Sequence, residues 1–420
     1  AKQLAAWNPY DQSAPASSFF DAEWMFGVKD GFDVVIGNPP YIDSETMTKA
    51  MPEMRNTYSS IYETAKGNWD IYILFFEFAL KHSRTGGTTA FIVPNKIVSI
   101  DYAEAVRNYI SKNAYFISLR DYSRVPVFEA SVYPCTLIFS KAKTDFVSIA
   151  KMNDLDEILY SNRISNKLFF SQNNWNIWFG TPNEVSLLTK LIEKSLFSIK
   201  DKYNVSAAAT VNEAYIVKEL LKNGVYNPKK FKLINSGTID KYVSLWGIKD
   251  TKYIKSSYST PVVDKTEVKK NLPNRYDLAT SEKLIIASMT KVLEVYYDNG
   301  EYLAGKSTTC IYQKESDFGL KFILGCLNSK LESFWLIKKY NSQAMSGEAI
   351  NISTSVVQNL PIPPATPAQQ KPIIALVDKI LVAKKADSTA DTSMLEAEID
   401  RLVYALYGLS EDEIKIVEGR

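Results

Sequence analysis

The chain has 420 residues, of which 46% are hydrophobic and 23% charged, and its formal net charge is +2 at pH 7. This is the composition of an ordinary globular protein with room for two or three domains. No apolar stretch reaches the roughly 20 residues that a membrane span requires, and Ala1-Lys2-Gln3-Leu4 lacks a signal-peptide pattern, so a cytoplasmic protein is expected. Three scattered cysteines (Cys135, Cys310 and Cys326) exclude a zinc site or a disulfide framework, and no metal is expected.

Residues 1–31 carry the turn signals Asn8-Pro9 and Ala14-Pro15 and predict a lead-in loop. The apolar run 32–37 then predicts a buried strand, which leads directly into the tetrad Asn38-Pro39-Pro40-Tyr41. Four residues of these types in this order are rare by chance, and their place behind a strand pattern makes the signal stronger.

The tetrad combines two hydrogen-bond acceptors with an aromatic ring. An amino group on a conjugated ring is a poor nucleophile because its lone pair is delocalised. The Asn38 side-chain oxygen and the Pro39 carbonyl can accept its two hydrogens and localise that lone pair, while Tyr41 offers a face for stacking. No base is needed beforehand, and the only histidine, His82, has no triad-like company. A strand followed by a Pro-Pro turn with a packed tyrosine is the structural alternative.

These residues resemble the Asn/Asp/Ser-Pro-Pro-Tyr/Phe signature of amino-methyltransferases that use S-adenosylmethionine. The resemblance implies that Asn38, Pro39, Pro40 and Tyr41 line the pocket for the extruded base, and that Asn38 and Pro39 abut the methyl donor.

The segments after the tetrad alternate between loop, helix and strand patterns. Residues 42–68 are polar and predict a mobile active-site loop. Helices are expected at 69–83 and 102–110, where apolar residues recur at helical spacing, and strands at 88–93, 115–119 and 136–139. This alternation predicts a parallel or mostly parallel α/β sheet.

The same order resembles the second half of the methyltransferase fold. Residues 86–96 resemble the region of its fifth strand, and 127–134 resemble its eighth motif, in which an aromatic ring contacts the flipped base opposite the tetrad tyrosine. The resemblance gives that role to Phe128, with an ordinary packed phenylalanine as the alternative. The expected fold class is thus α/β, a partial Rossmann-like methyltransferase sheet (strands four to seven) over residues 32–145, followed by an α+β target-recognition domain and C-terminal helices.

The family's glycine-rich turn for the methyl donor does not occur in the chain. No F-x-G-x-G-like segment precedes Asn38, and residues 304–307 do not fit such a turn. Without strands one to three, the tetrad strand would present an unpaired apolar edge. The expectation is that the missing methyltransferase strands, and possibly a nuclease domain, belong to the N-terminal part of a longer parent protein. The chain alone is then expected to be inactive.

The second half is more basic than the first. Residues 201–340 hold 22 Lys and Arg against 15 Asp and Glu, and lysines interleaved with tyrosines suit phosphate contact and base stacking. After a connector at 146–200, a DNA target-recognition domain is predicted at 201–365, with solvated surface lysines as the alternative. The candidate DNA-binding residues are Lys96, Lys229, Lys230, Lys241, Lys252 and Lys255.

Three further segments resemble restriction-modification methyltransferases. Residues 283–286, 302–308 and 322–330 resemble their target-recognition domains, 351–370 resembles the start of the helices in specificity subunits, and 399–414 resembles the ending of fused, type IIG enzymes. Residues 366–420 are expected to form C-terminal helices, and residues 368–407 among them to be packing helices, because their apolar residues fall at spacings of three and four.

The resemblance implies a site-specific adenine-N6 DNA methyltransferase that uses S-adenosylmethionine and acts on double-stranded DNA as the modification and specificity part of a restriction-modification enzyme. Two other functions remain open. One is a non-catalytic DNA-recognition fragment, and the other is a methyltransferase with the same tetrad that acts on RNA or on a protein glutamine.

Overall fold

The computed structural model describes residues 21–128, 132–313, 318–340 and 349–419. They form two compact units, the first ending at Phe179 and the second beginning at Gly180. The turns expected at Asn8-Pro9 and Ala14-Pro15 lie outside the described residues, as do Glu129, Ala130 and Ser131. Within the described ranges, no helix is long and apolar enough to cross a membrane.

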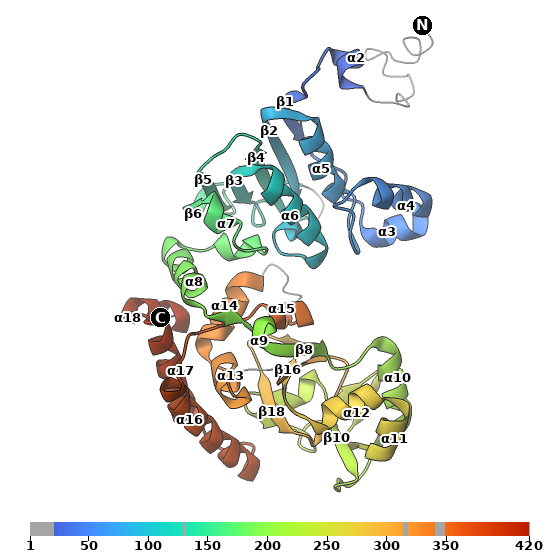
Figure 1. The fold of residues 1–420 in the computed structure, drawn as a ribbon, viewed down its shortest axis with the longest axis vertical. Coiled ribbons are helices and arrows are strands. Elements are labelled where there is room, and N and C mark those ends of the chain that lie inside the picture. Colours follow the sequence, from blue (N-terminus) through green and yellow to red (C-terminus); the bar gives the residue numbers. More distant parts are fainter. Residues whose placement is uncertain (1–20, 129–131, 314–317, 341–348, 420) are drawn as a thin grey trace. The chain divides into compact units, whose positions relative to one another are not determined.

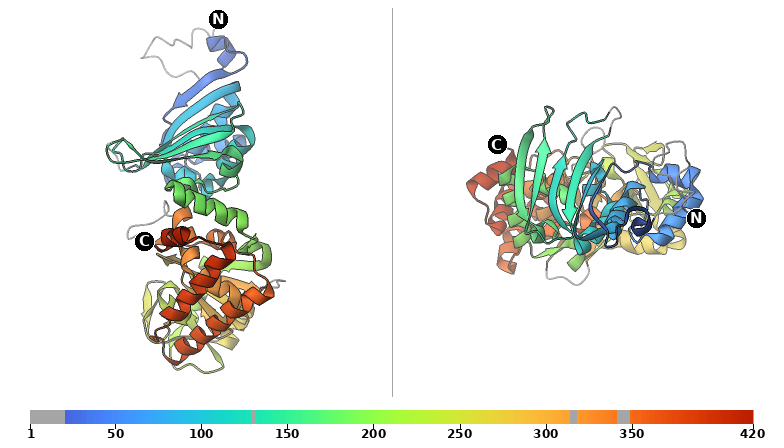
Figure 2. Two further views of the ribbon diagram at one scale, coloured as in Figure 1. Left: turned by 90° about the vertical axis from the view of Figure 1, so that its left-hand side faces the viewer. Right: turned by 90° about the horizontal axis from the view of Figure 1, so that it is seen from above.

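The first unit is built on a six-stranded sheet with the order β1-β2-β4-β3-β5-β6. The pairs β1·β2 and β3·β5 are parallel, and the other three pairs are antiparallel. The mixed α/β class is confirmed. The mostly parallel sheet is wrong, because β4 inserts between β2 and β3 and runs antiparallel to both. Figure 2 shows the twist of this sheet. The strands are Phe32–Gly37 (β1), Ser83–Pro94 (β2), Tyr115–Asp121 (β3), Pro134–Ser140 (β4), Phe146–Met152 (β5) and Ile158–Ser165 (β6).

Two helices, Tyr72–His82 (α5) and Glu104–Asn113 (α6), lie side by side on one face of the sheet (Figure 1). Their apolar residues meet those of the strands. The ring of Phe76 contacts the rings of Phe91 and Phe139, with centroids 5.3 and 5.9 Å apart. Both helices were expected from their apolar spacing. They begin within three residues of the expected positions. Apolar residues at helical spacing form the face that the helix buries, so the spacing locates the helix along the chain.

Strand β1 lies at the edge of the sheet, where only β2 pairs with it among the described residues. Its side chains Val34 and Ile36 are 61% and 80% exposed. The expected strand is therefore present, but its expected burial is wrong for these two residues. The unpaired apolar edge that the sequence implies is a feature of the structure.

Two segments expected to be loops contain helices. Residues 42–68 form Ser44–Ala50 (α3) and Pro52–Ile61 (α4), and Ala22–Phe26 (α2) forms within the lead-in. The Asp43 side chain accepts from Thr46 N–H at 2.7 Å and so caps α3, and Pro52 occupies the first turn of α4. Arg55 of α4 donates to the carbonyls of Gly67 and Trp69 at 3.0 and 3.1 Å. The helical pair is thereby anchored to the chain that leads into α5.

Residues 141–179 extend the first unit beyond β4. Strands β5 and β6 join the sheet, and the aromatic residues that follow pack against it. Phe116 of β3 contacts Phe169 and Trp175 with ring centroids 5.0 and 4.9 Å apart. The remaining short elements of this unit are Asn95–Val98 (η1), Asp101–Ala103 (η2), Asn166–Phe169 (α7) and Trp175–Trp178 (η3).

The second unit contains two four-stranded sheets, ordered β18-β16-β20-β8 and β19-β10-β15-β9. Helices α10, α11 and α12 pack against the second sheet through a core that includes Phe231, Val263 and Val268. The sheet strands are Tyr203–Ala207 (β8), Lys222–Asn223 (β9), Lys230–Ile234 (β10), Pro261–Asp264 (β15), Glu282–Ala287 (β16), Val295–Asn299 (β18), Tyr302–Ala304 (β19) and Thr308–Gln313 (β20). The three helices are Val211–Leu220 (α10), Lys265–Asn271 (α11) and Pro273–Thr280 (α12).

Two-stranded ribbons and further helices complete this unit. The packing role expected for the C-terminal helices is confirmed by the burial of Val377, Ile380 and Ile399. The ribbon strands are Phe197–Ser198 (β7), Ile239–Asp240 (β11), Val243–Ser244 (β12), Thr251–Tyr253 (β13), Ser256–Tyr258 (β14), Met289–Thr290 (β17), Ile350–Asn351 (β21) and Pro361–Ile362 (β22). The helices are Pro182–Lys194 (α8), Ile199–Lys202 (α9), Ser236–Thr238 (η4), Leu320–Leu327 (α13), Lys330–Tyr340 (α14), Thr354–Gln358 (α15), Pro367–Ala386 (α16), Ser393–Tyr407 (α17) and Glu411–Glu418 (α18).

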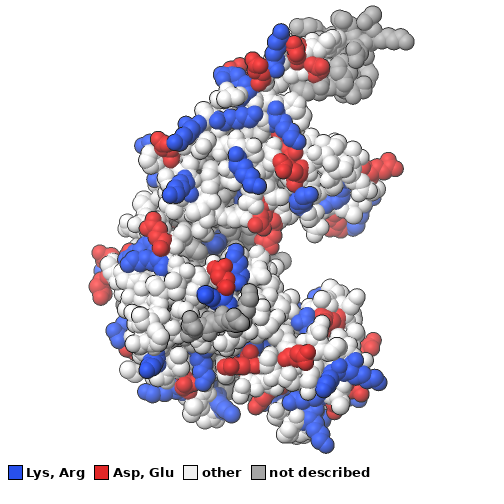
Figure 3. All heavy atoms as spheres, in the orientation of Figure 1, with Lys and Arg blue, Asp and Glu red and all other residues white. Residues whose placement is uncertain are grey.

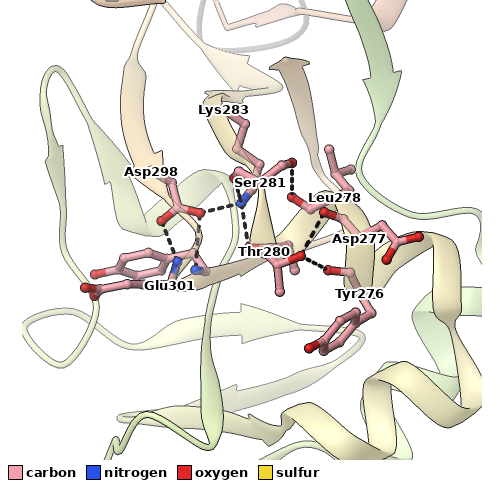
Figure 4. Close-up of polar contacts among 10 residues, drawn as sticks. Tyr276, Asp277, Leu278, Thr280, Ser281, Lys283, Asp298 and Glu301 are labelled. Carbon is pink, nitrogen blue, oxygen red and sulfur yellow. Dashed lines mark hydrogen bonds and ion pairs between the residues drawn. The ribbon is translucent and has the colours of Figure 1, made fainter. Parts of the chain in front are cut away.

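A buried ion pair joins β16 to β18 in the second unit (Figure 4). Lys283 and Asp298 are paired with side chains 0% and 1% exposed. Lys283 also donates to the carbonyls of Ala279 and Ser281, while Asp298 accepts from the backbone N–H groups of Glu301 and Tyr302. Both charges are thus surrounded by hydrogen bonds, which a buried ion pair requires.

Candidate functional site

The tetrad leaves the carboxyl end of β1, directly after Gly37. Because β1 and β2 are parallel, the end of β2 at Pro94 and the residues that follow it, Asn95 and Lys96, lie at the same edge of the sheet. Asn38 is exposed, Pro39 is buried and Tyr41 is half-buried. The strand therefore ends in a short segment that exposes a carboxamide beside a fixed aromatic ring.

Neither predicted acceptor is engaged within the described residues, where no hydrogen bond involves the Asn38 carboxamide or the Pro39 carbonyl. Asn38 is exposed, so its side-chain oxygen is open to an incoming donor, whereas Pro39 is buried. An amino group that offers two hydrogens has the chemistry to use both acceptors.

Tyr41 is held by three contacts. Its hydroxyl donates to the carbonyl of Ile92 on β2 at 3.1 Å, and its ring meets Phe128 and Tyr72 edge-to-face, with centroids 6.2 and 6.4 Å apart. Burial, with a smaller effect of the Cys135 thiol, raises the pKa of Tyr41 to about 12. The hydroxyl therefore keeps its proton and its hydrogen bond at any physiological pH.

Tyr41 and Phe128, which are 87 positions apart in the sequence, come together as the expected base pocket requires. Their ring planes stand at 83° to each other, however, so they touch edge-to-face and are not parallel. A flat ring can stack on Tyr41 from this side only after Phe128 has turned away.

An anchor for the chain after the tetrad was not expected from the sequence. The Asp70 carboxylate accepts from Ser44 N–H at 3.0 Å and from the Tyr102 hydroxyl at 2.5 Å. Next to it, Ile71 N–H donates to the carbonyl of Ile42 at 3.0 Å. Residues 42–44, immediately behind the tetrad, are thereby fixed to the start of α5. No local pattern marks Asp70, because its partners are 26 and 32 positions away.

The predicted DNA-binding lysines differ in their surroundings. Lys96 is exposed on η1, at the edge of the sheet where the tetrad lies. It is close enough to Asp43 to affect that carboxyl. The pKa of Asp43 is lowered chiefly by hydrogen bonds from Thr46 and to a smaller extent by the charge of Lys96. Lys241 instead donates to the carbonyl of Asn328 at 2.7 Å and helps to hold the β11–β12 turn.

The other four lysines lie on the second unit. Lys229, Lys252 and Lys255 are exposed, and Lys230 is half-buried. Figure 3 shows Lys and Arg side chains gathered over α11 and over the nearby end of the unit at β10. The exposed lysines of α11 are Lys269 and Lys270, which the sequence prediction did not include as DNA-binding residues.

The cysteines are free and buried, as expected of core thiols. Burial raises the pKa of each thiol, so none is a ready nucleophile or metal ligand. Within the described ranges, no group of three or more His, Cys, Asp or Glu side chains could hold a metal ion.

Comparison with known proteins finds two family models that match separate segments of the chain. Residues 5–128 match the family model of the Eco57I restriction-modification methylase, and residues 248–362 match that of the TaqI-like C-terminal specificity domain. The type II restriction enzyme and methyltransferase RM.Eco57I of Escherichia coli is 27% identical over 197 residues, which are 45% of this chain and 20% of that protein. The type II methyltransferase M.BstVI of Geobacillus stearothermophilus is 19% identical over 445 residues, covering 92% of this chain and 75% of that protein.

The solved structure of the type IIL restriction-modification enzyme MmeI in complex with DNA has a similar fold. It superimposes with a TM-score of 0.51 at 13% identity and covers 92% of this chain and 56% of its own. The chain thus spans about a fifth of RM.Eco57I and just over half of MmeI.

Residues 5–128 are therefore similar to the Eco57I restriction-modification methylases, and residues 248–362 are similar to the TaqI-like C-terminal specificity domains. The family resemblance predicted from the tetrad is confirmed.

This family uses S-adenosylmethionine, and the described residues fit only part of a site for it. Asn38 and Pro39 supply the acceptors expected beside the transferred methyl group. No glycine-rich turn between a strand and a helix, of the kind that holds the donor's nucleoside, occurs in the described part of the chain. The side of β1 on which the family places it is the open edge with exposed Val34 and Ile36.

Proposed function

We propose that this chain is the base-binding and target-recognition part of a site-specific DNA methyltransferase of a restriction-modification enzyme, which methylates N6 of adenine in double-stranded DNA. The observation that carries this proposal is the pair of acceptors at Asn38 and Pro39, which make no hydrogen bond to any described residue and lie beside the fixed ring of Tyr41 at the end of β1. The similarity to restriction-modification methylases supports it.

The acceptors act on the electrons of the target nitrogen. Each N–H of the adenine amino group donates to one oxygen, the Asn38 carboxamide or the Pro39 carbonyl, and this localises the nitrogen lone pair. The donor, when bound, supplies an electrophilic methyl group on a sulfonium. No side chain has to remove a proton before the amino nitrogen attacks the methyl group. Methyl transfer therefore does not require a catalytic histidine near the site.

Adenine reaches these acceptors only outside the helical stack, so the base is flipped. Tyr41 is the platform for one face of the base. We assign the opposite face to Phe128, which has to rotate out of its edge-to-face contact with Tyr41 as the base enters. Pro39 and Pro40 restrict the backbone, so the acceptors are ordered before binding.

We propose further that residues 201–365 recognise the DNA sequence and that Lys96, Lys229, Lys230, Lys252 and Lys255 contact phosphates. Four of these lysines are exposed. Lys241 is a weaker candidate for this role because its ammonium is already bound to the Asn328 carbonyl.

The nucleoside of the donor is held, in this proposal, by methyltransferase strands of a longer parent protein that cover the open edge of β1. The exposed Val34 and Ile36 support this, since such an edge is a liability unless it is covered. The chain of 420 residues alone then neither binds the donor measurably in calorimetry nor methylates DNA, whereas the complete enzyme does both.

Replacement of Asn38 by alanine in the complete enzyme tests the role of the carboxamide. We expect kcat for methyl transfer to fall by about 10²–10³-fold, the usual cost of removing one group that stabilises developing charge. The Kd for duplex DNA should stay within about twofold of wild type, because the phosphate contacts are elsewhere. Tritium transfer to duplex DNA and fluorescence anisotropy give the two values.

Asn68→Ala is the matched control, since Asn68 is an exposed asparagine of the same unit outside the tetrad. Normal methyl transfer by Asn38→Ala would refute the assignment. Wild-type transfer to RNA or to a glutamine-containing peptide instead of duplex DNA would select one of the other substrates. DNA binding by a complete enzyme that transfers no methyl group to any of them would identify a recognition module.

A further inference from the structure

The β13–β14 hairpin has an unusual turn. Tyr253 pairs with Ser256, so the loop consists of two residues only, Ile254 and Lys255. Their φ angles are +41° and +62°, in the left-handed region. Two-residue hairpins of this kind normally use Asn-Gly or Asp-Gly, and a β-branched residue at positive φ is an outlier. The turn therefore contains two residues that are unfavourable at the positive φ angles of its backbone.

The rest of the unit holds this turn in place. Tyr253 is buried, and Ile254 packs against the same core of the second unit. The carbonyl of Ile254 accepts from the Lys218 ammonium of α10 at 2.8 Å. On the other side, the Asn235 carboxamide donates to the carbonyl of Lys252 at 2.9 Å.

Asn235 also binds a second loop to the hairpin. Its side-chain oxygen accepts from Ser307 N–H at 3.0 Å. A side chain at Gly305 would put its Cβ 2.7 Å from that oxygen, so only glycine lets the 305–307 loop lie this close. One asparagine thus links the end of β10, the hairpin and the 305–307 loop into a rigid group.

The outer side of this group is basic. Lys252 and Lys255 are exposed on the hairpin, and Lys306 is exposed on the neighbouring loop. One carboxylate, Asp250, lies beside them, where it accepts from the Ser257 hydroxyl at 3.1 Å. A narrow, rigid ribbon with a positive tip matches the width of the DNA major groove, which admits a two-stranded β-ribbon.

We propose that the Ile254-Lys255 turn is a DNA-contacting tip, held in a strained backbone so that Lys255 meets duplex DNA in a fixed position. Backbone strain is retained mainly where function uses it, and glycine in place of Lys255 would relieve the strain at that position while Ile254 keeps its core contact. This inference rests on the proposed function, namely that the second unit binds DNA.

The substitution Lys255→Gly separates structure from function, because glycine accepts the positive φ of this position, the core-packed Ile254 is kept, and the ammonium group is removed. In the full chain we expect Tm to rise by about 2–4 °C. The affinity for a fluorescein-labelled duplex of randomised sequence should fall about tenfold, and the slope of log K against log salt between about 50 and 200 mM should decrease by about 1.

Lys379→Ala is the control, since Lys379 is an exposed lysine of the same unit on α16; it should leave the Tm, the affinity and the salt slope unchanged. A lowered Tm of Lys255→Gly would overturn the strain argument, and unchanged DNA binding would overturn the contact. If the wild-type chain does not bind the duplex at all, the proposed function fails and this inference fails with it.

Discussion

Asp70 acts on the tetrad indirectly, because it helps to anchor residues 42–44, which follow the tetrad in the chain. Its carboxylate fixes Ser44 and is itself held by Tyr102, whose hydroxyl also lies 3.4 Å from that of Tyr72. Tyr72 in turn packs against the ring of Tyr41. One carboxylate and two tyrosines outside the tetrad thus help to hold the tetrad in position.

Asp70→Asn should therefore slow catalysis without weakening DNA binding. An asparagine can replace only one of the two acceptor oxygens, so residues 42–44 gain freedom, and a small displacement of a reacting group costs about 10–100-fold in rate. We expect that loss in kcat in the complete enzyme, with KM for DNA changed by less than about threefold.

Asp101→Asn is the matched control, because Asp101 is an exposed aspartate of η2 next to Tyr102. The fluorescence of 2-aminopurine at the target position reports base flipping separately. A variant that flips the base normally but transfers slowly supports a positioning role. An equal loss of flipping and transfer would point instead to general damage of the unit.

At the scale of elements, the Lys283–Asp298 pair connects β16, β18 and the end of α12 (Figure 4). Burial raises the pKa of Asp298 in spite of the neighbouring ammonium, so the carboxylate depends on Lys283 to stay charged. Lys283→Met leaves that carboxylate buried without a cation. We expect the free energy of unfolding to fall by about 3–5 kcal/mol, measured by urea denaturation.

The pair between Lys321 and Asp378 provides the comparison, because its side chains are 35% and 47% exposed. Lys321→Met should cost about 0–1 kcal/mol, as exposed ion pairs usually do. Equal losses in the two variants would mean that burial does not decide the strength of these pairs.

Elements were predictable from the sequence where a regular apolar spacing decides them. The two helices on the sheet and the strands at Tyr115 and Thr136 follow from periodicity alone. Residues 42–68 were mistaken for a loop because their apolar residues are few, although Asp43 and Pro52 are recognisable helix starts. The β13–β14 turn gave no signal at all, because Ile-Lys is not a turn sequence.

At the scale of the whole molecule, the tetrad predicted the methyltransferase chemistry, the later segments predicted the restriction-modification branch, and the motif at 127–134 placed Phe128 opposite Tyr41. What it could not supply are contacts between distant positions, such as Asp70 with Ser44, or the use of Lys241 inside the fold. The pattern of charged and apolar residues in a sequence shows which chemical groups the chain carries. Only the folded chain decides which of them are left without partners, and the two acceptors of the tetrad, which make no hydrogen bond in the described part of the chain, belong to this class.

The most direct test of the account is a structure of the complete enzyme with duplex DNA and an unreactive analogue of the methyl donor. We predict an adenine turned out of the duplex, with its amino nitrogen about 2.7–3.2 Å from both the Asn38 side-chain oxygen and the Pro39 carbonyl, and with its ring on Tyr41. A target base that stays stacked in the duplex, or an amino group bound by other residues while both oxygens face solvent, would contradict the account.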